Sequence, residues 1–426
     1  MQQLNRVAII GGTRIPFCRS NTAYADLSNL DMLSDTLQQL VDRHQLGGIK
    51  IDEVIAGAVT THSRDWNLAR EAVLSTTLSP ATPGTTLQMA CGTSLQAALL
   101  IAARIASGQI DTGIAAGTDT TSDAPLVLQP RLAKRLMKAS QAKTLAAKLK
   151  SFQGFSLREL APQAPANGEP RTRLSMGQHC ELMAKQWGVT RQEQDQWAME
   201  SHLKAAVAYD KGFFDSLLRP YHGVARDNNL RPDSTLEKLS ALKPAFDRSA
   251  QGSLTAGNST PLTDGAAAVY LCSEAYALKH GLTVQAWLTQ GRTSAIDFVG
   301  GEGLLMAPTI AVSELLNRAS LTLQDFDYYE IHEAFAAQVL CTLKAWESED
   351  YCQKTLGLSH ALGKIDRSKI NVNGSSLAVG HPFAATGARI LGTIGKLLET
   401  QTNKRGLISI CTAGGMGAAA IVESAN

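Results

Sequence analysis

The stretch NVNGSSLAVGHPFAATGAR, residues 371–389, is the part of the sequence from which the fold can be worked out. It places one histidine, His381, in a glycine-bearing turn that leads into a helix. Gly374 and Gly380 free the backbone on either side of this turn, and Pro382 suits a first helical position. A histidine held between glycines at a helix start indicates a catalytic role, and this role needs a partner nucleophile elsewhere in the chain.

Length and composition bound the possibilities. At 426 residues, the chain is long enough for two or three domains or for one large duplicated unit. The net charge of +2 argues against nucleic acid as a partner. The opening residues, MQQLNRVAIIGG, predict a strand and turn rather than a signal peptide. No stretch approaches the roughly 20 apolar residues of a membrane span, so we expect a cytoplasmic protein.

The seven cysteines are odd in number, scattered and without CxxC pairs. This pattern predicts neither a disulfide framework nor a zinc site, and we expect no metal. A reducing compartment fits, in which a special cysteine is reactive. Only Cys91 and Cys411 stand in special contexts. We interpret the others as ordinary buried residues: Cys18, Cys180, Cys272, Cys341 and Cys352.

Strand and helix patterns alternate along both ends of the chain, which predicts an α/β fold with mainly parallel pairing. We expect strands over residues 6–10, 51–59, 85–90, 113–117, 328–331, 406–410 and 418–422. We expect helices over residues 30–41, 69–77, 95–108, 310–319 and 389–398, and a further helix that opens at His332.

Strand patterns almost vanish between about residues 121 and 250. A capping box of Thr190 and Glu193 opens one of the helices expected there. We interpret this region as a helical insertion that lies over the α/β core and covers the active site. The predicted division is an N-terminal half (1–121), the helical loop domain (122–250), a return to the N-terminal half (251–285) and a C-terminal half (286–426).

The segment from Arg131 to Lys150 carries seven Lys and Arg residues and no acid, with leucines at helical spacing. Three interpretations stay open. It is a solvated amphipathic helix, as charge runs usually are, or a surface that attracts the phosphates of a ligand, or a peripheral contact with an anionic membrane or a partner subunit.

The two ends of the chain repeat one pattern of helix, strand, glycine-bearing turn, helix and strand, so we predict a duplicated α/β unit. Cys91 lies at a helix start in the first copy, and His381 does so in the second. The duplication therefore brings the two face to face. The helix N-terminus is expected to favour the Cys91 thiolate, and His381 to take its proton, which is the arrangement of a covalent acyl-transfer catalyst.

Two further residues belong to this set. Cys411 ends an apolar strand and precedes TAGGMG, a loop able to expose backbone N–H groups as an oxyanion hole. His332 stands at a strand-to-helix turn. Taken singly, Cys411 is more often an ordinary strand-end residue and His332 a structural histidine.

The motifs QMACGTSLQA, AGNSTPLTDGAA, HEAFAAQ, NVNGSSLAVGHPFAATGAR and CTAGGMG together resemble the thiolase family, in order and over the whole chain. The variants HEAF and GHPFAATG most resemble 3-ketoacyl-CoA thiolases of the trifunctional fatty-acid-oxidation β-subunit type. The resemblance implies the thiolase fold, a layered α-β-α-β-α core. It implies thiolytic cleavage of 3-ketoacyl-CoA by CoA through an acyl-cysteine, with CoA as substrate and no cofactor.

The resemblance also implies roles. Cys91 attacks the keto carbon, and His381 activates it. His332 supports the enolate oxygen, and Cys411 protonates the enolate and later deprotonates CoA. The backbone N–H groups of Cys91 and Ala413 form the second oxyanion site.

For CoA, the resemblance points to five contacts: Met176, Phe246, Ala256, Thr260 and Phe335. Thr260 stands where many thiolases have Ser, and Ser375-Ser376 replaces a commoner Gly-Gly. A homodimer or a dimer of dimers is expected, with a hydratase/dehydrogenase subunit as a possible partner.

Other functions stay open. A biosynthetic acetyl-CoA acetyltransferase that makes acetoacetyl-CoA would use the same residues. A ketosynthase would be expected to carry a second histidine in place of CTAGGMG. A non-catalytic thiolase-like protein that binds acyl-CoA would not need the intact set of Cys91, His332, His381 and Cys411.

Overall fold

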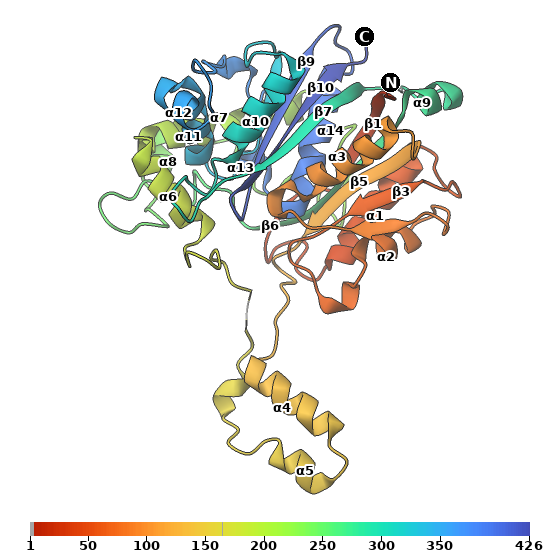
Figure 1. Cartoon of the computed structure of the whole chain (residues 1–426), viewed down its shortest axis with the longest axis vertical. Coiled ribbons are helices and arrows are strands. Elements are labelled where there is room, and N and C mark those ends of the chain that lie inside the picture. Colours follow the sequence, from red (N-terminus) through yellow and green to blue (C-terminus); the bar gives the residue numbers. More distant parts are fainter. Residues whose placement is uncertain (1–3, 164) are drawn as a thin grey trace.

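The computed structural model describes residues 4–163 and 165–426 (Figure 1). Its centre is a continuous sheet with the strand order β4-β3-β5-β6-β1-β7-β10-β9-β8. The strands of the N-terminal half are β1 (Val7–Arg14), β3 (Glu53–Ala56), β4 (Gly84–Thr86), β5 (Thr112–Asp119) and β6 (Thr263–Ser273), with the short β2 (Cys18–Arg19) beside β6. Those of the C-terminal half are β7 (Ala286–Ala295), β8 (Tyr328–Ile331), β9 (Arg405–Thr412) and β10 (Met416–Ser424).

The strand order is the same in both halves when each is read outward from the centre. It runs β1-β6-β5-β3-β4 in the first half and β7-β10-β9-β8 in the second. An isolated parallel bridge from Tyr329 to Ile370 stands in the place of the fifth strand. The halves join where β1 pairs with β7, Ala8 opposite Trp287. The predicted duplication is therefore confirmed.

The direction of pairing differs from the expectation. Among the described strands, only β3 with β4, β3 with β5 and β8 with β9 are parallel, and the other pairs are antiparallel. The prediction of mainly parallel pairing was wrong. In each half one antiparallel strand, β6 or β10, lies between the parallel strands and the centre, and hydrophobic periodicity carries no information on strand direction.

Two helices, α3 (Thr93–Ala106) and α14 (Thr386–Leu398), pack against each other and contact strands of both halves. A Cβ atom on Gly387 would lie 2.2 Å from the backbone nitrogen of Leu95, so only glycine allows this approach. Outer helices cover the remaining faces: α1 (Asn29–Arg43), α2 (Leu68–Leu74), α10 (Ala307–Ala319) and α11 (Ala336–Glu347). The layered α-β-α-β-α core is confirmed.

The shorter elements connect these layers. They are the helices α9 (Glu274–His280), α12 (Glu349–Lys354) and α13 (Ser376–Val379), and the 3-10 turns η1 (Ser63–Asp65), η2 (Ala90–Gly92), η3 (Leu157–Leu160), η4 (Arg367–Lys369) and η5 (Phe383–Ala385).

Between β5 and β6 the described residues form only helices and loops. The helices α6 (Met176–Gln186), α7 (Arg191–Asp210) and α8 (Leu236–Ser240) pack near the C-terminal half, where α6 and α7 contact α11. The predicted capping box of Thr190 and Glu193 opens α7.

The basic part of the insertion does not lie over the core as we expected. Helices α4 (Pro130–Gln141) and α5 (Leu145–Lys150) project from the body at the end of two connecting segments (Figure 1). No buried apolar cluster of the described residues joins these helices to the core, and they pack on each other instead. The division of the chain at residues 121, 250 and 285 stays a prediction.

Within the described residues, no helix is both long enough and apolar enough to cross a membrane.

Candidate active site

Cys91 lies in a tight turn between β4 and α3. The turn η2 raises it out of the strand, and the preceding residue, Ala90, has a φ of 46°. A non-glycine residue in this left-handed region is strained, and such strain gathers at functional sites. A Cβ on Gly92 would meet the Thr412 side chain at 2.9 Å, so this turn packs directly against the end of β9.

His381 is fixed from both sides. Gly380, with a φ of 102°, turns the chain, and the His381 backbone N–H donates to the Thr263 hydroxyl at 2.7 Å. The His381 Nδ1 lies 2.6 Å from the Thr386 hydroxyl. Pro382 is not a first helical residue as we expected, because the 3-10 turn η5 intervenes before α14 begins at Thr386. That extra turn places Thr386 beside the imidazole.

The structure brings the predicted nucleophile and base together. The His381 Nε2 lies 3.1 Å from the Cys91 Sγ. A thiol donates to Nε2 only if the imidazole proton sits on Nδ1, and the Thr386 oxygen is placed to accept that proton. One hydrogen-bonded chain therefore runs from the thiol to the helix start of α14.

The two turns are also tied to each other through their backbones. The Ser94 hydroxyl donates to the Ala384 carbonyl at 2.5 Å and accepts from the Ala388 N–H at 2.8 Å. Buried Asp119, at the end of β5, accepts from the Ala384 N–H at 2.8 Å. These bonds fix the distance between Cys91 and His381 without contacting either side chain.

Burial sets the charge state of the pair. It raises the pKa of the Cys91 thiol to about 12. Burial, with a smaller contribution from Arg389, lowers the pKa of His381 to about 3. The expectation that the helix N-terminus favours a resting thiolate was wrong, because desolvation of the charged form outweighs the backbone donors. The resting pair is a neutral thiol and a neutral imidazole.

His332 joins this pair from the end of β8. Its ring centroid lies 4.2 Å from that of His381, and Cys91, His332 and His381 each offer a donor atom within 4.8 Å of the others. The His332 Nδ1 lies 2.8 Å from the Ser376 hydroxyl, whereas its Nε2 is buried with no hydrogen-bond partner among the residues that the structure describes.

The partners of Ser376 decide which His332 nitrogen carries the proton. The Ser376 oxygen accepts from the Arg389 guanidinium at 2.6 Å. Its own hydrogen is then free to point at the His332 Nδ1, which leaves the imidazole proton on Nε2. His332 thus presents an unpaired N–H beside Cys91, where a developing oxyanion would accept it.

Sequence reasoning missed this supporting network. Arg389 is fully enclosed, bonds Ser375 as well as Ser376, and lies 3.8 Å from buried Glu330. Burial raises the pKa of Glu330 to about 8 despite Arg389. The one sequence signal was the Ser375-Ser376 pair, which stands where glycines are commoner.

The glutamate that follows His332 is structural in its contacts. The Glu333 carboxylate accepts from the Trp197 indole at 3.0 Å, the Ser201 hydroxyl at 2.8 Å and the Asn371 amide at 2.8 Å. It thereby ties the insertion helix α7 and the loop before His381 to the turn that carries His332.

Cys411 and Ala413 approach from the end of β9. The Ala413 backbone N–H is directed at the Cys91 sulfur, where it lowers the pKa of the thiol against the larger effect of burial. Burial, and then Cys91, raises the pKa of Cys411 well above its usual value. The four predicted catalytic residues are thus gathered in one place, while their individual roles stay predictions.

The predicted CoA contacts gather less completely. A cavity of about 610 Å³ is lined by Phe246, Ala256 and Thr260, and by Leu377 from the loop before His381. Phe335 contacts Phe246 edge-on at 5.8 Å behind this lining. Met176 packs in the same apolar cluster without lining the cavity.

The same cavity has a basic mouth that sequence reasoning did not find. Arg19, Arg231 and Lys238 line it, with Asp233 as the neighbouring acid. Lys238 pairs with Asp233, and the Arg231 guanidinium donates to backbone carbonyls. These cations come from β2, from the loop before α8 and from α8 itself, so no run of charge in the sequence marks them.

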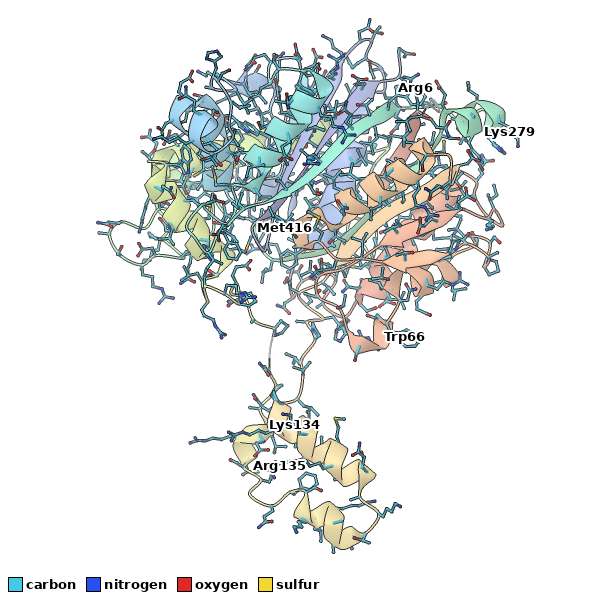
Figure 2. The ribbon with its side chains drawn as sticks, viewed as in Figure 1. Arg6, Trp66, Lys134, Arg135, Lys279 and Met416 are labelled. Carbon is cyan, nitrogen blue, oxygen red and sulfur yellow. The ribbon has the colours of Figure 1, made fainter. Side chains whose placement is uncertain are left out.

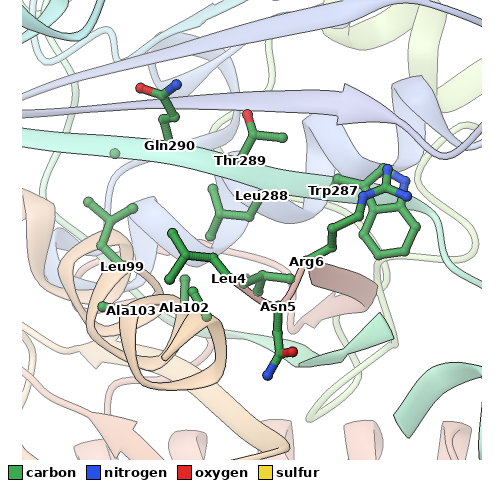
Figure 3. A pocket seen from close by; sticks show the side chains of 13 residues that line it. Leu4, Asn5, Arg6, Leu99, Ala102, Ala103, Trp287, Leu288, Thr289 and Gln290 are labelled. Atoms are coloured by element: carbon green, nitrogen blue, oxygen red, sulfur yellow. The ribbon is translucent and has the colours of Figure 1, made fainter. Parts of the chain in front are cut away.

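A second cavity, of about 420 Å³, lies at the centre of the sheet, where β1, α3 and β7 meet (Figure 3). Leu99, Leu288 and Trp287 are among the apolar residues that line it, and the Arg6 guanidinium stacks 3.8 Å from the Trp287 ring. It contains none of the predicted site residues.

The fold and the paired Cys91 and His381 define a class: an acyl-transferring enzyme built from two α/β halves, with a cysteine nucleophile. Family models agree. The model for "Thiolase, N-terminal domain" matches residues 7–275, and the model for "Thiolase, C-terminal domain" matches residues 283–424. The chain belongs to the thiolase family, as the sequence motifs predicted.

Relatives and solved structures agree with this assignment. The chain is 41% identical over 428 residues to a 3-ketoacyl-CoA thiolase of Yersinia enterocolitica, covering 99% of this chain and 98% of the relative. A Bacillus anthracis acetyl-CoA acetyltransferase superposes with a TM-score of 0.82 at 29% identity, covering 99% and 100% of the two chains. Human mitochondrial 3-ketoacyl-CoA thiolase superposes with a TM-score of 0.82 at 26% identity, with full coverage of both.

Proposed function

We propose that this chain cleaves 3-ketoacyl-CoA with CoA, giving acetyl-CoA and an acyl-CoA shortened by two carbons, as a fatty-acid β-oxidation thiolase. The observation that carries the proposal is the 3.1 Å contact between the Cys91 Sγ and the His381 Nε2, beside the unpaired Nε2 of His332. The full-length similarity to a 3-ketoacyl-CoA thiolase supports it.

In the first half-reaction, Cys91 attacks the keto carbon while His381 takes the thiol proton through its free Nε2. Because thiol and imidazole are both neutral at rest, charge forms only as the new bond forms. The bond between the second and third carbons then breaks, leaving an acyl-cysteine and the enolate of acetyl-CoA. The His332 Nε2–H and the protonated His381 stabilise the enolate oxygen, and Cys411 protonates the enolate carbon.

In the second half-reaction, Cys411 takes the proton of the incoming CoA thiol. The CoA thiolate attacks the acyl-cysteine, and the backbone N–H groups of Cys91 and Ala413 bind the tetrahedral oxyanion. Cys91 leaves and recovers its proton from His381. The neutral resting pair is thereby restored, and no cofactor enters the cycle.

The cavity beside Leu377 is the proposed path for CoA. Its apolar lining suits the pantetheine arm, and the cations Arg19, Arg231 and Lys238 suit the phosphates. Phe246, Ala256 and Thr260 are then direct contacts, while Met176 and Phe335 act from behind the wall.

The test is CoA-dependent thiolysis of a 3-ketoacyl-CoA series from short to long chains, with Cys91→Ala as the control. We expect activity across the series that rises with chain length and is absent from the variant. The similarity to an acetyl-CoA acetyltransferase favours one second candidate, the biosynthetic enzyme, and activity confined to acetoacetyl-CoA would support it. A folded chain that binds acyl-CoA without turnover would instead be a binding protein.

We also propose a homodimer, or a dimer of dimers, paired through the outer edge of the sheet. Strand β4 is that edge, and its residues Thr85 and Thr86 are exposed. An edge strand offers unpaired backbone groups to a second copy. Trp66, 90% exposed, presents a large apolar side chain in the same half (Figure 2). Sedimentation should show a dimer, which Thr86→Pro should weaken.

The projecting helices α4 and α5 support a peripheral contact with an anionic membrane or a hydratase/dehydrogenase subunit. Met137, Leu145 and Leu149 are each more than 60% exposed and alternate with lysines. Arg135 is not a free charge, because it bonds Glu159 and three backbone carbonyls within the hairpin.

Charge reversal should therefore use residues other than Arg135. Lys134→Glu with Lys138→Glu should weaken binding to anionic vesicles and leave thiolysis unchanged. Lys279→Glu, at the opposite end of the molecule (Figure 2), is the matched control. Equal binding of vesicles by both variants would exclude the membrane contact and leave the solvated helix pair, the phosphate-attracting surface and the partner subunit. We also propose a cytoplasmic location, which rests on the sequence analysis alone.

A further inference from the structure

Three side chains at the reacting centre form a set that the cysteine spacing in the sequence did not suggest. Cys91, His332 and His381 hold one donor atom each within 4.8 Å of the other two, and all three residues are buried. One thiol and two imidazoles are the donors that zinc prefers, and three protein ligands with a fourth open position are typical of a reactive zinc site.

The free atoms of these side chains point to the same place. The Nδ1 atoms of both histidines are occupied, by Ser376 and by Thr386. Both imidazoles therefore present Nε2, and the Nε2 of fully buried His332 has no protein partner. A metal-binding histidine is oriented by donating its other ring N–H to an oxygen acceptor, and the Thr386 oxygen is placed to be that acceptor for His381.

The distance between the Cys91 and His381 donor atoms requires only a small movement. In a tetrahedral zinc site, sulfur and nitrogen ligands lie about 3.5 Å apart. The Cys91 Sγ and His381 Nε2 are 3.1 Å apart here. His381 already has its proton on Nδ1. His332 must move its proton to Nδ1, and the Ser376 oxygen can accept it there, because a hydroxyl oxygen has two lone pairs.

We propose that Cys91, His332 and His381 bind a zinc-class divalent cation, and that this reversibly blocks the enzyme. Binding forms the bonds from sulfur and both Nε2 atoms to the metal, and the Cys91 thiol proton leaves to solvent. The fourth position stays open to water or a CoA thiol. The blocking effect rests on the proposed function, whereas the binding itself does not.

The test uses cobalt(II) as a visible probe of the site. The full chain, stripped with a chelator, is titrated with Co²⁺ and its absorbance recorded. We expect a thiolate-to-cobalt charge-transfer band that saturates at one equivalent and is displaced by Zn²⁺. Thiolysis should fall in parallel in Zn²⁺-buffered solution and return on chelation. Bound metal should also protect Cys91 from alkylation.

Matched variants make the result specific. Cys91→Ala should abolish the band, whereas Cys272→Ala, which removes another buried thiol from a separate apolar cluster, should keep it. His332→Ala should weaken binding by more than the about 10-fold to 100-fold that loss of an outer-shell partner costs. His62→Ala tests the exposed His62–Asp123 pair as an unrelated surface site.

The outcomes separate the two proposals. Normal thiolysis without a cobalt–thiolate band overturns the metal site and leaves the proposed function standing. A saturable band that depends on Cys91, in a protein with no thiolysis on any chain length, supports the site and removes the proposed function. A band that survives in Cys91→Ala, or that His62→Ala removes, overturns the assignment to these three ligands.

Discussion

The two halves of the molecule share one architecture but contribute different catalytic groups. In the N-terminal half, a turn leads from β4 through Cys91 into α3. In the C-terminal half, a turn leads from the Ile370 bridge through His381 into α14. The first turn is short and strained at Ala90, and the second is long and carries its own hydroxyl, Thr386.

The difference teaches how a duplicated fold builds an asymmetric site. The nucleophile needs its sulfur held against the base, which a sharp turn supplies. The base needs a fixed ring orientation and a fixed tautomer, which the longer turn and Thr386 supply. The packing of α3 on α14 then brings the two turns into contact, and each prediction below changes one side of this comparison.

The largest effect is expected from the base. His381→Ala should lower the rate of thiolysis by about 10²-fold to 10⁴-fold, because the neutral thiol loses its proton acceptor. Steady-state kinetics at saturating CoA measure this. His44→Gln is the control, since it changes a half-buried histidine with a lowered pKa in the N-terminal half. A His381→Ala enzyme within 10-fold of the parent would show that the thiol ionises without it.

The contact between the halves should be the next most sensitive point. Gly387→Ala puts a methyl group into the Leu95 backbone and should destabilise the fold by about 1–3 kcal/mol or more. Gly395→Ala, two turns along the same helix, meets its nearest atom at 3.3 Å and should be tolerated. Urea denaturation of both proteins measures the difference. Equal midpoints would mean that the crossing of α3 and α14 is not tight.

The support of His332 should have a smaller effect. Ser376→Ala removes the hydroxyl partner of the His332 Nδ1 and should lower kcat by about 10-fold, corresponding to about 1.4 kcal/mol. Ser375→Ala is the matched control, since that hydroxyl bonds Arg389 but not His332. Ser376→Thr should restore kcat. A loss confined to KM, or shared equally by Ser375→Ala, would contradict the positioning role.

The last prediction needs no change in the nucleophile or the base and concerns the resting charge state. Because the pKa of the Cys91 thiol is raised to about 12, the thiolate fraction is small at neutral pH and grows with each pH unit up to that value. Alkylation of Cys91 should therefore accelerate by about 10-fold per pH unit, without a plateau between about pH 6 and about pH 9. Cys91→Ala gives the background rate. A flat profile would indicate a resting thiolate–imidazolium pair.

Much of this could be predicted from the sequence. The repeated pattern predicted the duplication, and with it the meeting of Cys91 and His381, because equivalent turns of two similar units face each other. The motifs also predicted that Cys411 and His332 lie beside this pair. The capping box of α7 was visible because capping depends on residues three positions apart.

What the sequence did not reveal depends on contacts between distant segments. The antiparallel direction of β6 and β10 is set by the path on which the chain returns to the sheet. Hydrophobic periodicity carries no information on that path. Arg389 and Glu330 meet only in the fold, so neither looked special alone. The pKa of the Cys91 thiol depends on its burial in the fold, which outweighs the effect of the local helix terminus. Helices α4 and α5 project because the core offers them no apolar surface to pack on.

The most direct test of the central claim, that Cys91 is the residue that carries the acyl group, is the mass of the enzyme after incubation with a 3-ketoacyl-CoA in the absence of CoA. We predict a mass increase equal to the shortened acyl group, located on the peptide that contains Cys91, lost on addition of CoA and absent in Cys91→Ala. Thiolysis-competent enzyme that forms no adduct, or an adduct on Cys411 instead of Cys91, would contradict the account.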